Sequence, residues 1–303
     1  MSKQAASAFP RDVGSKKIRS FAGWRALVTG GSSGIGLELA RALVRDGARV
    51  CIAARDEQRL AAAVRELTAC VPAGGVAPCF VALDVTSPAA IGSGLKAVLA
   101  ALGGLDLLVN NAGYASPGYI DELDDRVYVD MMAVNYLGPM RLSRECLRHF
   151  IAQGGGRIVN VTSMLGFMGT FGYSAYCASK YALSGYTEAL RQDALPFGVR
   201  VHLCYPPTTT TPGLERENQS KPPEAWAIEG KSRAFSAAQV AAAVLGGVRA
   251  GKFHVLVGWD SWLIWVAQRF APGLVRWVID RTLMKELRPR EPGQALALPS
   301  RQD

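Results

Sequence analysis

The segment that decides the fold is Thr29-Gly30-Gly31-Ser32-Ser33-Gly34-Ile35-Gly36. It follows a short apolar run, residues 24–29, that predicts a buried strand, and it precedes residues 37–44, whose apolar positions have helical spacing. A glycine-rich turn between a strand and a helix brings backbone N–H groups and the positive end of the helix dipole to the phosphates of a dinucleotide. A tight loop without a ligand would have similar glycines, so the strand–loop–helix context is what favours a cofactor site.

Three glycines of this segment are expected to shape the cofactor loop. Gly30 allows the chain to turn sharply, Gly34 lets the backbone approach a pyrophosphate, and Gly36 lets the helix pack closely on the strand. The predicted cofactor-binding residues of the loop are Thr29, Gly30, Ser32, Ser33, Gly34, Ile35 and Gly36.

The end of the next predicted strand, residues 49–54, indicates which dinucleotide is bound. Enzymes that use NAD usually have Asp or Glu about 20 residues after the glycine loop, bonded to the ribose hydroxyls. This chain has Ala54 and Arg55 there, with Arg59 one helical turn further on. A guanidinium can pair with a 2′-phosphate, which a carboxylate would repel. We therefore predict NADP(H) as the cofactor; the alternative is that Arg55 is a solvated surface residue.

Later strand ends are expected to complete the cofactor site. Asp84 follows the predicted strand 78–83, where its carboxylate can reach the adenine or cap the following helix. Small residues after the predicted strand 106–109 let the chain pass close to the nicotinamide ribose, and Asn110 can bridge two strands. The further predicted contacts are Asp84, Val85, Asn111, Ala112, Gly113, Tyr176, Lys180, Pro206 and Thr209.

Ser163, Tyr176 and Lys180 have the spacing of a site that protonates a reduced ketone. Tyrosine can donate this proton when its pKa falls from about 10 towards neutrality. Tyr176 and Lys180 lie at i and i+4 on one face of the predicted helix 174–195, so the ammonium can favour the phenolate. Ser163 ends the predicted strand 156–162, and its hydroxyl can orient the carbonyl oxygen.

Asn135 is an unusual residue for the middle of a helix, here the predicted helical stretch 124–150. Its freed carbonyl or its amide can hold a water chain that leads to Lys180. A kink or an interhelix hydrogen bond explains it equally well.

In this order, the glycine loop, Asn135, Ser163, Tyr176 and Lys180 resemble the short-chain dehydrogenase/reductase family over residues 24–257. The resemblance implies that Tyr176 is the general acid/base, that Lys180 lowers its pKa and binds the nicotinamide ribose, and that Ser163 stabilises the carbonyl oxygen. It also implies that Asn135 completes a proton relay. A homodimer or homotetramer formed through helices within 124–150 and 174–195 is a further implication.

The chain after the predicted strand 200–204 carries a narrower resemblance. Its elements Tyr205-Pro206-Pro207-Thr208-Thr209-Thr210-Thr211-Pro212-Gly213 and Glu217-Asn218-Gln219-Ser220-Lys221-Pro222 are similar to those of the 3-ketodihydrosphingosine reductases. The resemblance implies that NADPH reduces a long-chain keto lipid, 3-ketodihydrosphingosine, to sphinganine. Two alternatives stay open: a reductase of another ketone, such as a steroid or a 3-oxoacyl thioester, and an inactive cofactor-binding relative with a lipid-regulatory role.

Predicted strands and helices alternate to about residue 257, which predicts a parallel sheet covered on both faces, a doubly wound α/β Rossmann fold. We expect a flexible basic N-terminal segment (1–22) and one NADP-binding and catalytic domain (23–257). Apolar, tryptophan-rich helices (258–290) and a tail (291–303) are expected to follow.

The net charge of +9 is concentrated outside the predicted catalytic domain. Residues 1–25 hold six Lys or Arg and one Asp, and residues 258–303 hold seven basic and five acidic residues. Since no reading motif or basic face is visible, a nucleic-acid partner is not expected. The cysteines lack a C-x-x-C pair and the histidines lack metal-ligand spacing. We therefore expect a cytoplasmic protein without disulfides or a metal.

The C-terminal helices predict either membrane contact or a cover over the substrate cleft. The apolar stripe of the first helix consists of Trp259, Trp262, Leu263, Val266 and Phe270. A second predicted helix, 274–287, adds basic residues, a combination that suits peripheral contact with the cytoplasmic face of a membrane. The run is too short to span a bilayer, and no signal peptide is expected. The alternative is a pair of helices packed over the cleft or against a second subunit.

Overall fold

A seven-stranded sheet forms the centre of the molecule, and each adjacent pair of its strands is parallel. The computed structural model describes residues 17–229 and 233–286. The strand order is β3-β2-β1-β4-β5-β6-β9. The strands are β1 (Arg25–Thr29), β2 (Arg49–Ala54), β3 (Cys79–Ala82), β4 (Leu107–Asn110), β5 (Gly156–Val161), β6 (Val199–Tyr205) and β9 (His254–Leu256). The predicted doubly wound α/β fold is thus confirmed.

Helices cover both faces of this sheet, each over its own apolar core. One face packs against α1 (Gly34–Arg45), α2 (Glu57–Thr68) and α9 (Ala237–Arg249). The other packs against α3 (Pro88–Leu102), α5 (Gly138–Gln153) and α6 (Ser174–Ala194). Burial on both sides explains why the central strands are runs of apolar residues without alternation.

Residues before the expected domain boundary at residue 23 already pack against the domain. Ile18 and Phe21 are buried in the core on the α1 and α9 face. The Ile18 N–H donates to the Arg249 carbonyl oxygen at 2.9 Å, and the Phe21 N–H donates to Asp46 Oδ2 at 2.6 Å. The prediction of a flexible segment reaching residue 22 is therefore wrong for residues 17–22, because two apolar side chains anchor them. Its first 16 residues lie outside the described residues, as does the predicted tail.

The expected helical stretch 124–150 is interrupted at Asn135. It consists of α4 (Asp125–Met132), a π-helical turn (Ala133–Leu137) and α5. Pro139 has no N–H, so it cannot donate the usual helical hydrogen bond to the carbonyl oxygen of Asn135. The π-helical turn lies where that bond is missing.

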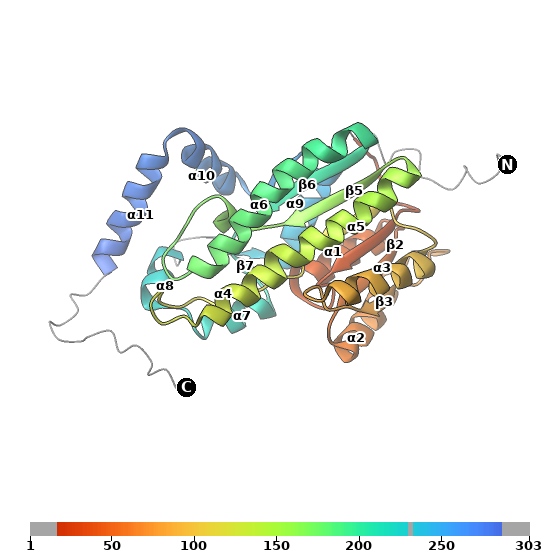
Figure 1. Ribbon diagram of the computed structural model, residues 1–303, viewed down its shortest axis with the longest axis horizontal. Coiled ribbons are helices and arrows are strands. Elements are labelled where there is room, and N and C mark those ends of the chain that lie inside the picture. The colour runs from red at the N-terminus through yellow and green to blue at the C-terminus, as the bar shows by residue number, and fades with distance from the viewer. Residues whose placement is uncertain (1–16, 230–232, 287–303) are drawn as a thin grey trace.

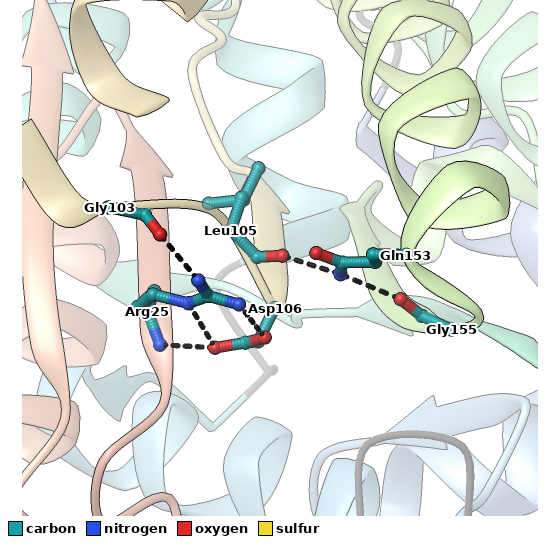
Figure 2. Close-up of polar contacts among 6 residues, drawn as sticks. All are labelled: Arg25, Gly103, Leu105, Asp106, Gln153 and Gly155. Carbon is teal, nitrogen blue, oxygen red and sulfur yellow. Dashed lines mark hydrogen bonds and ion pairs between the residues drawn. The ribbon is translucent and has the colours of Figure 1, made fainter. Parts of the chain in front are cut away.

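A buried ion pair joins β1 and β4 at the edge of the sheet opposite the glycine loop (Figure 2). Asp106 Oδ2 accepts from the backbone N–H of Arg25 at 2.9 Å and from its Nε at 2.8 Å, and Oδ1 accepts from Nη2 at 2.7 Å. Beside this pair, the Gln153 amide donates to the carbonyl oxygens of Leu105 and Gly155 at 2.7 Å each. These bonds fix the starts of the strands whose other ends carry the site.

The chain after β6 builds a separate layer at one end of the molecule. It contains β7 (Thr209–Thr210), α7 (Pro212–Asn218), α8 (Pro223–Glu229) and β8 (Phe235–Ser236), and later α10 (Trp259–Phe270) and α11 (Pro272–Glu286). Helix α11 packs against α8 and α10. Figure 1 shows α10 and α11 at the far end of the molecule from α2 and α3. Among the described residues, no helix has the length and hydropathy needed to cross a bilayer.

Candidate active site

A cavity of about 920 Å³ lies at the carboxyl edge of the sheet. Its walls come from the loops after β1, β4, β5 and β6, and from α6, α7, α8 and α10. Ligands of open parallel sheets bind at this edge. The predicted site residues that line the cavity are Gly30, Ser32, Ser33, Gly34, Ile35, Asn111, Ala112, Gly113, Ser163, Tyr176, Lys180, Pro206 and Thr209.

The glycine loop has the geometry expected of a phosphate cradle. Gly34 begins α1 with φ of +56°, a conformation that side chains disfavour, and it lines the cavity. A Cβ on Gly36 would lie 2.2 Å from the carbonyl oxygen of Gly30, so only glycine allows this close packing. The Ser33 side chain does not cap α1. The first turn of α1 therefore presents N–H groups and a positive dipole end to the cavity, which fits the diphosphate of a dinucleotide.

Thr29 supports the site from behind and does not line the cavity. It is buried, and its hydroxyl accepts from the N–H groups of Asn111 and Ala112 at 3.0 and 3.1 Å. The same hydroxyl donates to the Val109 carbonyl oxygen at 3.3 Å. Thr29 thus ties the loop after β1 to the loop after β4, a role that differs from the predicted cofactor contact.

Four of the predicted cofactor contacts, Arg55, Arg59, Asp84 and Val85, lie outside this cavity. Arg55 and Arg59 are exposed beyond β2, and Val85 is buried in the core. Asp84 Oδ1 accepts from the N–H and the hydroxyl of Thr86 at 2.9 and 2.8 Å. The N–H bond and, more weakly, the nearby Arg55 lower the pKa of Asp84. The alternative that Asp84 caps the next helix is wrong, because the cap of α3 is Ser87.

Asn110 forms the predicted bridge between strands. It is paired with Asn160 across β4 and β5, and its amide donates to Asn160 Oδ1 at 2.8 Å. The same amide group reaches Ser143 Oγ on α5 at 3.0 Å. The bond pattern fixes the end of β4, and with it the loop that carries Asn111 to Gly113.

Ser163, Tyr176 and Lys180 meet in the cavity from two elements. Ser163 lies two residues after the end of β5, while Tyr176 and Lys180 are on α6. The Lys180 ammonium lies 5.6 Å from the centroid of the Tyr176 ring and donates to the Val161 carbonyl oxygen at 3.1 Å. A carbonyl placed here could accept hydrogen bonds from a serine and a tyrosine hydroxyl while a buried cation lies beside the phenol.

The protonation of this group departs from the expectation. Burial raises the pKa of Tyr176, the charge of Glu217 raises it further, and hydrogen bonding to Ser163 lowers it. Burial lowers the pKa of Lys180 to about 8. The expected lowering of the Tyr176 pKa is thus wrong for the chain alone, because desolvation outweighs a cation that faces the ring and bonds to Val161. The phenol is consequently protonated at neutral pH.

Asn135 forms an interhelix hydrogen bond, which is one of the explanations that the sequence allowed for this residue. Its Nδ2 donates to Ser179 Oγ on α6 and to the Tyr114 carbonyl oxygen, both at 3.0 Å. A Cβ on Gly113 would lie 2.8 Å from Asn135 Oδ1 and 3.3 Å from the Lys180 ammonium. A side chain at position 113 would therefore clash with the Asn135 amide oxygen and crowd the Lys180 ammonium, so this position requires glycine.

Three charged residues of the cavity region were missed by the functional interpretation of the sequence: Glu217, Lys221 and Glu229. Glu217 and Glu229 line the cavity, and Lys221 forms ion pairs with both. The segment 217–222 was recognised only as a sequence match. Three charges within one short stretch after the catalytic residues could have indicated a polar part of the substrate site.

Comparison with known proteins places this site in a family. The family model described as short chain dehydrogenase matches residues 25–222. The chain belongs to this family. As a short-chain dehydrogenase it is an oxidoreductase that acts on a ketone or the corresponding alcohol, and its cofactor is a nicotinamide dinucleotide.

Several relatives of this short-chain dehydrogenase have assigned names. It is 34% identical to a 3-ketodihydrosphingosine reductase of Bos taurus, covering 82% of this chain and 76% of the relative. It is 35% identical to a 3-dehydrosphinganine reductase of Danio rerio, covering 80% and 73%. A putative ketoacyl reductase of Streptomyces coelicolor is 37% identical, over 62% of this chain and 71% of that one.

A solved structure has the same fold. The short-chain dehydrogenase/reductase from Burkholderia phymatum, crystallised in complex with NAD, superposes with a TM-score of 0.71. The superposition covers 91% of this chain and 99% of the other, at 24% sequence identity.

Proposed function

We propose that this enzyme uses NADPH to reduce the ketone of 3-ketodihydrosphingosine, which yields sphinganine. The observation that carries the proposal is that Ser163, Tyr176 and Lys180 line one cavity together with the glycine loop. The names of the relatives support the choice of substrate. The same cavity lies beside the exposed apolar helix α10, which suits a substrate with a long alkyl chain.

Each polar side chain has one task in this reaction. When bound, NADPH supplies the hydride that adds to the carbonyl carbon. Tyr176 donates its phenolic proton to the carbonyl oxygen, and burial favours the protonated form that this direction requires. The Ser163 hydroxyl donates a hydrogen bond to the same oxygen and orients it. Lys180 would hold the ribose of the bound cofactor with its ammonium group, which would also offset negative charge on the phenol oxygen once the proton has left.

The proton that Tyr176 gives up is replaced through the Asn135 region. The carbonyl oxygen of Asn135 lacks its usual helical donor because residue 139 is proline. A water molecule bonded to this carbonyl would link Asn135 to the Lys180 ammonium, whose nearness to the Asn135 side chain is shown by Gly113, which lies against both groups. Asn135 is therefore the fourth catalytic residue of the proposal.

The preference for NADPH over NADH rests on Arg55 and Arg59. Both side chains are exposed just beyond β2, where the ribose of the adenosine half is expected. Within residues 17–229 and 233–286, Arg55 is in no ion pair, so its guanidinium is available to a phosphate. No carboxylate follows β2 directly to bond the ribose hydroxyls of NAD.

Membrane contact is part of the proposal, through α10 and α11. Trp259 is 73% exposed, Phe270 81% and Trp277 54%. Arg276 and Arg281 accompany them on α11. Exposed aromatic residues with arginines are typical of helices that lie in the interface of an anionic membrane. The six unpaired cysteines agree with a cytoplasmic face.

Assembly into a homodimer or homotetramer is also proposed. The helices α4, α5 and α6 would form the contact. Val129, Ile151 and Tyr181 are large apolar side chains exposed on these three helices, which supports an interface there.

A substrate panel tests the proposed function. Purified enzyme is mixed with NADPH and either 3-ketodihydrosphingosine, a steroid ketone or a 3-oxoacyl thioester, with and without phospholipid vesicles, and the loss of NADPH absorbance is followed. We expect the highest kcat/KM for the keto lipid. Reduction of the thioester alone would replace this proposal with the ketoacyl reductase activity that the Streptomyces relative suggests. NADPH binding without turnover of any ketone would point to the inactive, lipid-regulatory alternative.

A further inference from the structure

Two carboxylates and one lysine form a compact cluster in the wall of the cavity. Glu217 is on α7, Lys221 follows this helix, and Glu229 ends α8. The Lys221 ammonium is bonded to the Glu229 carboxylate and lies 3.6 Å from Glu217 Oε1. The Lys221 side chain is 0% exposed, while those of Glu217 and Glu229 are 20% and 22% exposed. The carboxylates line the cavity and Lys221 does not.

The other partners in this cluster are neutral. The Tyr173 hydroxyl donates to Glu217 Oε1 at 2.5 Å, and the Thr208 hydroxyl donates to Glu229 Oε1 at 2.8 Å. The Lys221 ammonium also lies 4.6 Å from the centroid of the Trp226 ring. Among the described residues, two carboxylates therefore meet one ammonium group, so one carboxylate of the pair has no cationic partner of its own in the cluster.

This negative charge lies close to the catalytic tyrosine. The Tyr173 ring is 6.2 Å from the Tyr176 ring, and Tyr173 is the residue that bonds to Glu217. Consistently, the Glu217 charge contributes to the raised pKa of Tyr176. Glu217 and Tyr176 therefore belong to the same part of the cavity wall, joined through Tyr173.

We propose that Glu217 and Glu229 bind the ammonium group of an α-amino ketone and so select this substrate class and orient its carbonyl. The inference rests on the proposed function, whose substrate carries an amino group on the carbon next to the ketone. Glu217 and Glu229 act here as specificity residues, because they bind the substrate without taking part in the transfer of hydride or proton.

The chemistry of the substrate matches the cluster in charge and in position. The nitrogen and the oxygen of an α-amino ketone are on adjacent carbons, so an ammonium on Glu217 keeps the oxygen near Tyr176 and Ser163. A carboxylate has about four lone-pair positions, and the printed bonds leave each glutamate able to accept more. Steroid ketones and simple 3-oxoacyl chains bring no cation to this point, so binding them would bury the negative charge without a partner.

Among the described residues, none of the other charged groups that line the cavity is placed to bind the substrate ammonium beside Tyr176. Arg216 and Arg233 are exposed. Asp260 accepts the N–H of Ser261 at 2.9 Å, and Lys180 is bonded to Val161. Only the Glu217 and Glu229 pair therefore combines an excess negative charge with a place next to Tyr173 and Tyr176.

The test compares two ketones that differ only in the amino group. They are 3-ketodihydrosphingosine and 1-hydroxyoctadecan-3-one, presented in identical mixed micelles to the wild type and to the Glu217→Gln and Glu229→Gln variants. Loss of a charge-assisted bond should lower kcat/KM for the amino ketone by about 10- to 100-fold. The value for the amine-free ketone should not fall and is expected to rise, because Gln removes the negative charge that this ketone leaves without a partner. Glu224→Gln is the matched control, because Glu224 is on α8, accepts from Tyr119 and does not line the cavity.

Two further measurements keep the outcome decisive. The NADPH dissociation constant and the unfolding temperature show whether each variant is folded and loaded. An equal loss for both ketones, or no loss in either variant, overturns the inference while the proposed function stands. If the wild type reduces neither ketone, the proposed function fails. The inference is then decided by tryptophan quenching with sphinganine and with octadecane-1,3-diol: equal affinity for the two would overturn it.

Discussion

Tyr176 is held in its protonated form by its surroundings. Burial and the neighbouring Glu217 raise the pKa of its phenol, while Lys180 lies against the ring. A tyrosine in this state carries the proton that an oxyanion needs, but its raised pKa makes it a weaker acid than free tyrosine, so a positive charge beside the phenol must favour the release of that proton.

Removing this proton should abolish most of the activity. In Tyr176→Phe, kcat for ketone reduction should fall by about 10² to 10⁴-fold, the usual contribution of general acid catalysis. The NADPH dissociation constant, measured by fluorescence, should change little. Tyr181→Phe is the control, since Tyr181 is exposed on the same helix. Full activity in Tyr176→Phe would refute the assigned proton donor.

Lys180 should set the alkaline limit of the reaction. Its lowered pKa of about 8 means that the ammonium is present below that pH and is lost as the pH rises through it. With the amine-free ketone 1-hydroxyoctadecan-3-one as substrate, the pH profile of kcat/KM should therefore fall above about pH 8, because the only ammonium that this reaction requires is that of Lys180. Lys180→Arg, which stays charged, should be slower but should lack this falling limb. The same limb in both proteins would contradict the assignment.

Arg55 should determine the preference between the two cofactors. Arg55→Ala should raise the dissociation constant of NADPH by about 10- to 100-fold, because a charge-assisted pair with the 2′-phosphate is lost. That of NADH should hardly change. Arg65→Ala serves as the control from the exposed side of α2. Equal losses for NADPH and NADH would show that Arg55 does not contact the phosphate.

The sequence predicted correctly which residues lie close together where their spacing within one element determines this. Tyr176 and Lys180 share a helix face by their separation, and Ser163 ends a strand, so their meeting in one cavity could be predicted. The pKa of Tyr176 could not, because it depends on burial and on Glu217, which lies 41 positions away in the sequence. The contact of Glu217 and Glu229 with the same Lys221 could not be predicted either, because it depends on how α7 and α8 lie relative to each other.

The contact between α1 and β1 depends on Gly36. Gly36→Ala would place a methyl group 2.2 Å from the Gly30 carbonyl oxygen, so the helix must move away from the strand. We expect destabilisation by about 1–3 kcal/mol in urea unfolding and weaker NADPH binding. Gly92→Ala on α3 meets no atom within 4 Å and should be neutral or slightly stabilising. Unchanged NADPH binding in Gly36→Ala would show that the close packing of α1 on β1 is not needed for the glycine loop to bind the cofactor.

Element boundaries were predicted well wherever the apolar pattern was continuous. The strand over residues 49–54 agrees with β2, and β1 begins one residue later than expected. The stretch 124–150 was taken as one helix because its apolar periodicity continues through the π-helical turn. Pro139 carried the signal, since a missing N–H frees the carbonyl four residues earlier. The anchoring of Ile18 could not be foreseen, because its partner Arg249 is far away in the sequence.

The molecule as a whole has one end with exposed aromatic side chains, formed by α10 and α11. Phe270→Ser and Trp277→Ser should each weaken binding to anionic vesicles by about 10- to 100-fold, if the rings enter the interface. Sedimentation of the protein with vesicles measures this loss. Val76→Ser, which changes an exposed apolar residue between α2 and β3, is the control. Wild-type binding in both Phe270→Ser and Trp277→Ser would refute the proposed membrane contact.

Helix α10 belongs both to this aromatic end and to the wall of the reaction cavity, to which it contributes Trp259, Ser261 and Ile264. A lipid that enters beside α10 would pass from the bilayer to Tyr176 without dissolving in water. The kinetics should then obey surface dilution: the rate would follow the mole fraction of ketone within the lipid phase, and adding inert phospholipid at a constant total amount of ketone would slow the enzyme.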